Sequence, residues 1–180
     1  PGGGRGALTV ADEFAALGRE AAQHRDCRPP RPFTSLRRVL AAARACAQVI
    51  PWMKAAGGGS IVLVASISGL EASPGPDFGY ASAKAALIAY AKKLSIFHGP
   101  DRIRANAIAP GSIEFEGGLW DQVRRQDPPR YEAVRGTIPW GRMGTPQEVA
   151  DVAVFLASPR AQWITGACVP IDGGQHKGMR

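Results

Sequence analysis

The sequence has few of the residues that build metal sites and disulfide frameworks. Its 180 residues include three cysteines and three histidines, widely spaced and without a CxxC pair. They are Cys27, Cys46 and Cys168, and His24, His98 and His176. Structural zinc sites need cysteine or histidine at short fixed spacings, and disulfide frameworks usually pair an even number of cysteines. We therefore expect neither a metal site nor a disulfide framework.

The chain also lacks a long apolar run. No stretch approaches the roughly 18 consecutive apolar residues of a membrane-spanning helix. Its first residues, PGGGRGALTV, do not show the basic segment and apolar core of a secretory signal. We therefore expect a soluble cytoplasmic protein that makes no membrane contact, folded as a single domain over residues 1–180.

Aromatic residues are scarce, at 7%, which bears on the net charge of +7. Residues 1–59 hold nine Lys/Arg against four Asp/Glu, whereas residues 60–180 hold thirteen against eleven. The early arginines stand among alanine and proline, as in RDCRPPRPFTSLRR, without the interleaved aromatics that stack on bases. We interpret residues 1–33 as an atypical basic segment, and a nucleic-acid partner is the disfavoured alternative.

What the sequence does contain is a series of short apolar runs after residue 57. Residues 60–66 form a short continuous apolar run, which is typical of a parallel strand buried on both faces, and residues 103–109 predict a second buried strand. Residues 166–172 predict a third strand. Because predicted helices alternate with these strands, the pattern indicates an α/β fold with a doubly wound parallel sheet. In such sheets ligands bind beyond the carboxyl ends of the strands, here at 66–69 and 110–115.

The predicted helices cover residues 11–25, 34–56, 79–97 and 145–158. Thr34 or Ser35 is expected to cap the second of them. The last has a complete start, with Thr145 as cap, Pro146 in the first turn and Glu148 closing a capping box. Residues 112–144 are expected to form a long connection.

Tyr80 and Lys84 lie four residues apart on the third predicted helix, so both project from one face. An ammonium beside a phenol favours the phenolate, and such a pair can exchange a proton near neutral pH. Reversible carbonyl reduction needs such a proton donor. Ser66, at the end of a strand, is placed to hold the carbonyl oxygen. Taken alone, Tyr80 and Lys84 are better explained as an interfacial tyrosine and a snorkelling lysine, and only the surrounding motifs favour the chemical role.

Several motifs occur in order: GGGSIVLVASISG, YASAK, IRANAIAPGSI, GRMGTPQEVADVAVFLAS and ITGACVPIDGG. Together they resemble the short-chain dehydrogenase/reductase family, over about residues 34–178. The resemblance implies a Rossmann-type doubly wound parallel sheet, here N-terminally incomplete, with residues 34–180 as the catalytic portion.

The resemblance also implies roles for single residues. Tyr80 would be the catalytic acid/base, Lys84 would favour its phenolate and bind the nicotinamide ribose, and Ser66 would steady the substrate carbonyl, with Ser68 as its rival. Three residues, Pro110, Gly111 and Ile113, match the loop whose backbone approaches the nicotinamide. A plain turn is the alternative for Pro110–Gly111. Asp172–Gly173–Gly174 matches a C-terminal structural turn of the family.

The chain departs from the family in its first part. The Gly-rich phosphate loop that follows the family's first strand is replaced by PGGGRGALTV, the Asn-Asn-Ala-Gly motif is absent, and the helix at 34–56 lacks the asparagine of the proton relay. Phe115 stands where a threonine often contacts the carboxamide.

From these observations we expect an NAD(P)-dependent oxidoreductase that acts on a carbonyl or a secondary alcohol, with NADP preferred over NAD. A 3-oxoacyl thioester is the favoured substrate, and sugar-like or steroid-like ketones are alternatives. We also expect a homo-oligomer formed through the helices near 36–56 and 79–97. The alternative function is an inactive protein of the same fold that acts only by association with a partner subunit.

Overall fold

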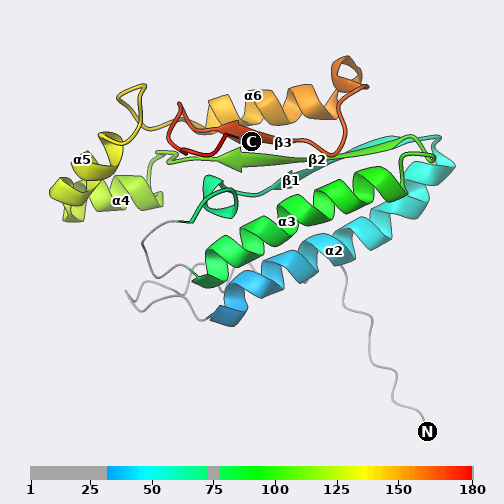
Figure 1. Ribbon diagram of the computed structural model, residues 1–180, viewed down its shortest axis with the longest axis horizontal. Coiled ribbons are helices and arrows are strands. Elements are labelled where there is room, and N and C mark those ends of the chain that lie inside the picture. The colour runs from blue at the N-terminus through cyan, green and yellow to red at the C-terminus, as the bar shows by residue number, and fades with distance from the viewer. Residues whose placement is uncertain (1–31, 73–77, 180) are drawn as a thin grey trace, which may run out of the picture.

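The computed structural model describes residues 32–72 and 78–179, which form a three-layer arrangement of helices around a sheet (Figure 1). The predicted helix at 11–25 and the basic segment up to residue 31 lie outside the described residues. The elements are α2 (Pro32–Ala55), β1 (Gly59–Val64), the 3₁₀ turn η1 (Ile67–Gly69), α3 (Phe78–Phe97), β2 (Ile103–Pro110), α4 (Leu119–Gln126), α5 (Pro128–Arg135), α6 (Pro146–Ala157), the 3₁₀ turn η2 (Pro159–Ala161) and β3 (Cys168–Ile171).

The sheet has three parallel strands in the order β1-β2-β3. Gly59 pairs with Ile103 and Val64 with Ile108, whereas β3 pairs with the second half of β2. Helices α2 and α3 cover one face and α6 covers the other (Figure 1). The predicted α/β parallel sheet is therefore confirmed.

The strands are mainly apolar because both faces of the sheet are buried. Ile61 and Leu63 of β1 pack toward α2 and α3, whereas Val62 between them packs in the cluster around Leu156 of α6. The same alternation holds in β2, where Ile108 joins the α6 side. A strand with one wet face would alternate apolar and polar residues instead.

The three helix predictions that fall within the described residues were correct in position, with one error at a cap. Helix α2 begins at Pro32, so Thr34 and Ser35 lie within its first turn and neither is the N-cap. At α6, Thr145 is the N-cap, and its side chain and that of Glu148 form the predicted capping box. Pro146 occupies the first turn, where a missing N–H costs no helical hydrogen bond.

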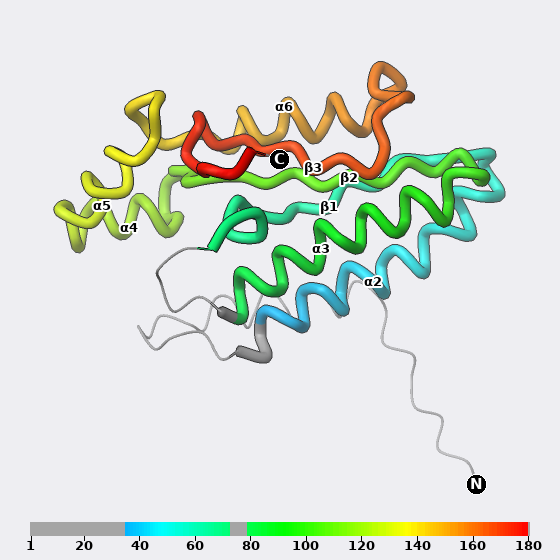
Figure 2. Tube along the Cα trace, in the orientation of Figure 1, coloured from blue at the N-terminus to red at the C-terminus, as the bar shows by residue number. Residues whose placement is uncertain are grey.

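The connection between Ser112 and Gly144 is more ordered than predicted, because it contains helices α4 and α5. Both lie beyond the carboxyl ends of the strands (Figures 1 and 2). Asp127 ends α4 and also caps α5, accepting a hydrogen bond from the Arg130 N–H. Each of these helices has only eight residues, which is shorter than the window of about 11–18 residues over which a helical period is read from a sequence.

Candidate functional site

Ser66 lies beyond the end of β1, in a turn and not in the strand. The prediction placed the end of the strand at residue 66, but pairing stops at Val64. Ser66 is the N-cap of η1, and its Oγ accepts a hydrogen bond from the Ser68 N–H at 3.2 Å. The serine is 8% exposed. Because the cap occupies only a lone pair of Oγ, the hydroxyl hydrogen remains available for a ligand oxygen.

Tyr80 and Lys84 share one face of α3, as predicted. The Lys84 Nζ lies 5.6 Å from the centroid of the Tyr80 ring and donates a hydrogen bond to the Val64 carbonyl at 2.8 Å. Burial lowers the pKa of Lys84, and the positive charge of Arg38 lowers it further. The ammonium therefore links the tyrosine ring to the backbone two residues before Ser66.

Gly69 brings the turn of Ser66 against the start of α3. A Cβ atom at this position would lie 2.7 Å from the carbonyl carbon of Lys84 and 2.7 Å from the Ala85 nitrogen. Both neighbours are backbone atoms of α3. The missing side chain therefore lets η1 pack directly on the helical turn that carries Lys84.

The loop Pro110–Ile113 leaves the end of β2 at the same end of the sheet. The Gly111 N–H donates to the Ile171 carbonyl, and Ile113 forms a parallel bridge with Gly144. In that bridge the Gly144 N–H donates to the Ser112 carbonyl, and the Gly144 carbonyl accepts the Glu114 N–H. The N–H and C=O of Ile113 therefore point away from Gly144, and within the described chain no hydrogen bond engages them.

Comparison with known proteins places this arrangement in a family. A family profile described as Enoyl-(Acyl carrier protein) reductase matches residues 34–176. The chain belongs to the short-chain dehydrogenase/reductase family. The resemblance inferred from the motifs is thus confirmed, and the fold is the Rossmann type.

Relatives within the short-chain dehydrogenase/reductase family include several oxidoreductases. The chain is 42% identical to isoepoxydon dehydrogenase patN of Aspergillus clavatus over 130 residues, covering 72% of this chain and 50% of that protein. It is 44% identical to the 3-oxoacyl-[acyl-carrier-protein] reductase FabG of Chlamydia muridarum over 131 residues, again 72% and 50%. A solved 3-oxoacyl-[acyl-carrier protein] reductase with bound NAD from Brucella melitensis matches with a TM-score of 0.66 and 33% identity, covering 77% and 48%.

This short-chain dehydrogenase/reductase chain spans about half the length of the curated relatives that it matches. The matched part contains the Ser66 turn, the start of α3 and the Pro110–Ile113 loop. Among the described residues, no helix is both long and apolar enough to cross a membrane, and no group of acidic, histidine or cysteine side chains is arranged to hold a metal ion.

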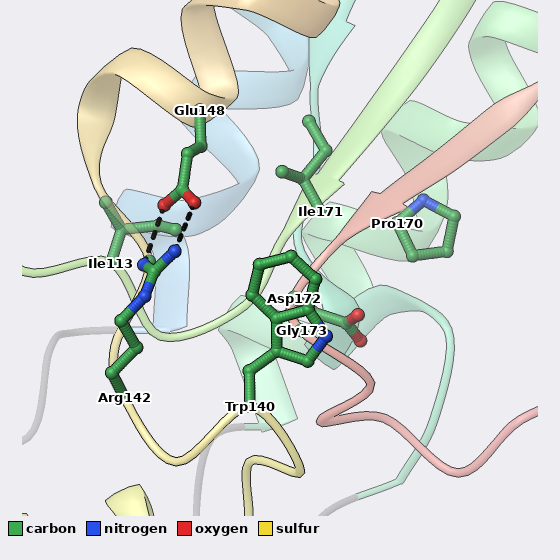
Figure 3. A pocket seen from close by; sticks show the side chains of 9 residues that line it. Ile113, Trp140, Arg142, Glu148, Pro170, Ile171, Asp172 and Gly173 are labelled. Atoms are coloured by element: carbon green, nitrogen blue, oxygen red, sulfur yellow. Dashed lines mark hydrogen bonds and ion pairs between the residues drawn. The ribbon is translucent and has the colours of Figure 1, made fainter.

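A pocket opens beside the Pro110–Ile113 loop, with a volume of about 240 Å³ (Figure 3). Its walls come from the end of β3 through Gly173 and from five further residues, Ile113, Trp140, Arg142, Gly144 and Glu148. Of the predicted site residues, only Ile113 lines it. A larger pocket of about 800 Å³ lies at the opposite end of β2, around Ile103 and Trp163, and contains none of them. Pocket volume alone therefore does not locate the site, because neither pocket is lined by Ser66, Tyr80 or Lys84.

Arg142 and Glu148 close one side of the smaller pocket with a pair of hydrogen bonds (Figure 3). The Arg142 guanidinium and the Thr145 N–H lower the pKa of Glu148 to about 2. A carboxylate with a lowered pKa stabilises the fold above its ordinary pKa of 4.5, and this contribution is lost as the pH falls toward 2.

Replacing Glu148 by glutamine is expected to reduce the loss of stability that the protein shows as the pH falls from 4.5 to 2. Glutamine keeps an oxygen that can accept the Thr145 N–H, so the capping box survives while the charge is removed. The urea midpoint of the wild type should exceed that of Glu148→Gln at pH 7, and the difference should vanish as the pH falls from 4.5 to 2. A difference that stays constant over this range would contradict the charge pairing.

The segment that follows Ile113 is fixed by a charged network that the sequence did not reveal. Glu114 accepts a hydrogen bond from the Tyr131 hydroxyl at 2.7 Å and pairs with the Arg124 Nε at 2.9 Å. Arg124 also pairs with Asp121, a buried carboxylate that accepts the Gly117 N–H. The hydrogen bond that the Tyr131 hydroxyl donates to Glu114 raises the pKa of Tyr131. Helices α4 and α5 are thereby tied to the residue next to Ile113.

Proposed function

We propose that this chain carries the proton-transfer part of an NAD(P)-dependent oxidoreductase that interconverts a carbonyl and a secondary alcohol. Tyr80 delivers a proton to the carbonyl oxygen, Lys84 favours the phenolate that remains, and Ser66 holds the same oxygen by its hydroxyl. The observation that carries the proposal is the position of Lys84. Its ammonium lies against the Tyr80 ring and hydrogen-bonds Val64, two residues before Ser66.

Each of these three side chains has a defined part in the reaction. Reduction adds a hydride to the carbonyl carbon and a proton to its oxygen, and Tyr80 supplies the proton. The ammonium of Lys84 stabilises the phenolate left behind. In the oxidative direction Tyr80 takes the proton back from the alcohol. Ser66 is preferred over Ser68 because the η1 cap fixes its oxygen.

A nicotinamide cofactor supplies the hydride when it is bound. Its carboxamide offers one donor and one acceptor, and the free N–H and C=O of Ile113 form the complementary pair on the edge of the Pro110–Ile113 loop. Lys84 has ammonium hydrogens left for a ribose hydroxyl after its bond to Val64. The described residues thus fit the nicotinamide end of NAD or NADP. We propose NADP as the preferred form.

For the substrate we propose a 3-oxoacyl thioester. Relatives that carry this name support it, and exposed apolar side chains near the strand ends, Phe115 and Leu119, offer an apolar wall for an acyl chain. A substrate panel of a 3-oxoacyl thioester, a cyclic ketone and a sugar-like ketone separates the alternatives.

The first test is a titration of the purified chain with NADPH and with NADH, followed by nicotinamide fluorescence. Saturable binding with a Kd of about 1 µM to 1 mM is expected, tighter for NADPH, and turnover of the substrate panel should follow. Absence of binding to both cofactors at about 1 mM would contradict the enzyme and support the alternative of an inactive protein of this fold.

We further propose that α2 and α3 form the contact between two copies of the chain. Both helices expose apolar side chains, namely Leu36, Leu40, Trp52, Ile96 and Phe97. Light scattering should give a dimer or a larger even assembly for the wild type and a smaller species for Leu40→Glu. The matched control is Val154→Glu, which charges an exposed valine on the opposite helix layer and should leave the assembly unchanged.

A further inference from the structure

The C-terminal turn that follows β3 is built around the carboxylate of Asp172. One oxygen accepts the Gly174 N–H at 3.0 Å, and the other accepts the N–H and ring Nδ1 hydrogen of His176 at 2.9 and 2.6 Å. Burial alone would raise the pKa of Asp172, but these hydrogen bonds outweigh it and hold the pKa below its ordinary value. The carboxylate thus fixes the backbone on both sides of Gln175.

From this turn the Gln175 side chain reaches the Pro110–Ile113 loop. Its Oε1 accepts the Ser112 N–H at 2.9 Å, and its Nε2 donates to the Ser112 Oγ at 3.0 Å. Both ends of one planar amide therefore bind the same residue, 63 positions earlier in the chain. Gly111 makes this approach possible, since a Cβ there would lie 2.7 Å from the Gln175 Oε1 and 2.7 Å from the Asp172 Cβ.

These contacts complete a series of four consecutive peptide groups, each held by one hydrogen bond. The Gly111 N–H donates to Ile171, the Ser112 N–H to Gln175, the Ser112 carbonyl accepts from Gly144, and the Glu114 N–H donates to Gly144. Three of the four partners are backbone groups, and the fourth is the side chain of Gln175. Figure 2 shows the C-terminal segment in red passing beside the end of β2, where these bonds form.

We propose that Gln175 is a positioning residue that fixes the Pro110–Ile113 loop in the conformation that presents the N–H and C=O of Ile113. This proposal deepens the proposed function, on which its consequence for cofactor affinity rests. The geometric part stands independently, because the loop contacts are those of the free protein. An amide is well suited to the position, since its oxygen can accept the Ser112 N–H while its NH₂ group donates to the Ser112 hydroxyl.

The variant that tests the proposal is Gln175→Met, which keeps the length of the side chain and removes both hydrogen bonds to Ser112, together with a longer one of 3.5 Å from Nε2 to the Thr137 hydroxyl. Gln175→Glu is the rescue variant, because a carboxylate can accept from the Ser112 N–H and from its hydroxyl. The matched control is Gln162→Met, at an exposed glutamine beside the larger pocket at the far end of β2. Amide hydrogen exchange at Ser112 is measured for all four proteins without cofactor, followed by the NADPH and NADH titrations.

Exchange at Ser112 is expected to be about tenfold faster in Gln175→Met and close to wild type in Gln175→Glu and Gln162→Met. The Kd for the cofactor should rise about tenfold in the methionine variant and recover in the glutamate variant. Unchanged exchange in Gln175→Met would overturn the proposal. Faster exchange with an unchanged Kd would overturn the link to the cofactor. If the wild type binds no cofactor, the proposed function fails, and the exchange at Ser112 still decides whether Gln175 positions the loop. Should Gln175→Met not fold, Gln175→Ala also removes the side-chain bonds to Ser112 and gives the same comparison with Gln175→Glu.

Discussion

Replacing Tyr80 by phenylalanine is expected to lower the rate of carbonyl reduction by about 10²–10⁴-fold. Phenylalanine keeps the aromatic ring that lies 5.6 Å from the Lys84 Nζ, but it has no hydroxyl to give a proton to the substrate oxygen. The packing at the start of α3 and the cofactor groups of Ile113 are unaffected. The rate is followed as the loss of NAD(P)H absorbance, and the Kd of the cofactor is measured on the same protein.

Tyr90→Phe is the matched control for this experiment, because it removes a hydroxyl from the same helix about three turns away. Tyr90 packs against the core cluster that includes Cys46 of α2 and is remote from the strand ends. Tyr90→Phe should therefore keep the wild-type rate. If Tyr80→Phe also kept it while binding cofactor normally, the proton would have to come from another group, and the assignment of Tyr80 would be wrong.

Lys84 places a positive charge beside the tyrosine that is proposed to give the proton. Its ammonium is held by the Val64 carbonyl, and burial has already lowered its pKa. The tyrosine therefore sits beside a cation that is partly desolvated, where its effect on a phenolate is larger than it would be in water. This environment is the physical reason for expecting so large an effect from the loss of one hydroxyl.

The order of the elements and most of the proposed site follow from local sequence patterns. Residues 60–66 and 103–109 could be recognised as buried strands because helices cover both faces of each strand, so most of their positions are apolar, with Arg104 and Asn106 as polar exceptions in the second. The start of α6 could be recognised because Thr145, Pro146 and Glu148 act within one helical turn. The spacing of Tyr80 and Lys84 is likewise local to one helix.

What the sequence did not reveal depends on contacts between distant segments. Buried Asn106 of β2 bonds the Ile164 carbonyl and the Ala167 N–H, and Gln175 reaches Ser112 across 63 positions. Helices α4 and α5 have only eight residues each, and ion pairs such as Glu114–Arg124 tie them to the loop beside a small apolar cluster around Val123 and Tyr131. Pairings of this kind leave no periodic signal, because either partner would be unremarkable as a surface polar residue.

The substitution Gly69→Ala is expected to lower the free energy of unfolding by about 3 kcal/mol or more. The added Cβ would lie 2.7 Å from the Ala85 nitrogen, 2.7 Å from the Lys84 carbonyl carbon and 3.0 Å from the Lys84 oxygen. These are backbone atoms of α3, which cannot rotate away as a side chain can. Either η1 or the helix must therefore move. Urea unfolding followed by circular dichroism measures the loss.

The matched control is Gly141→Ala, because the two glycines are required for different reasons. Gly141 has a φ of +70° and no atom within 4 Å of an added Cβ, so its substitution costs only the left-handed backbone, about 1–2 kcal/mol. Gly69 differs, because its φ is not in the left-handed region and the space that a Cβ would need is occupied by backbone atoms of α3. A shift of η1 away from α3 separates Ser66 from Tyr80, so Gly69→Ala should lower activity even below its unfolding transition, whereas Gly141→Ala should not. Equal losses of stability in the two variants would mean that η1 yields easily, and that the contact between the serine turn and the tyrosine helix is not what holds the site together.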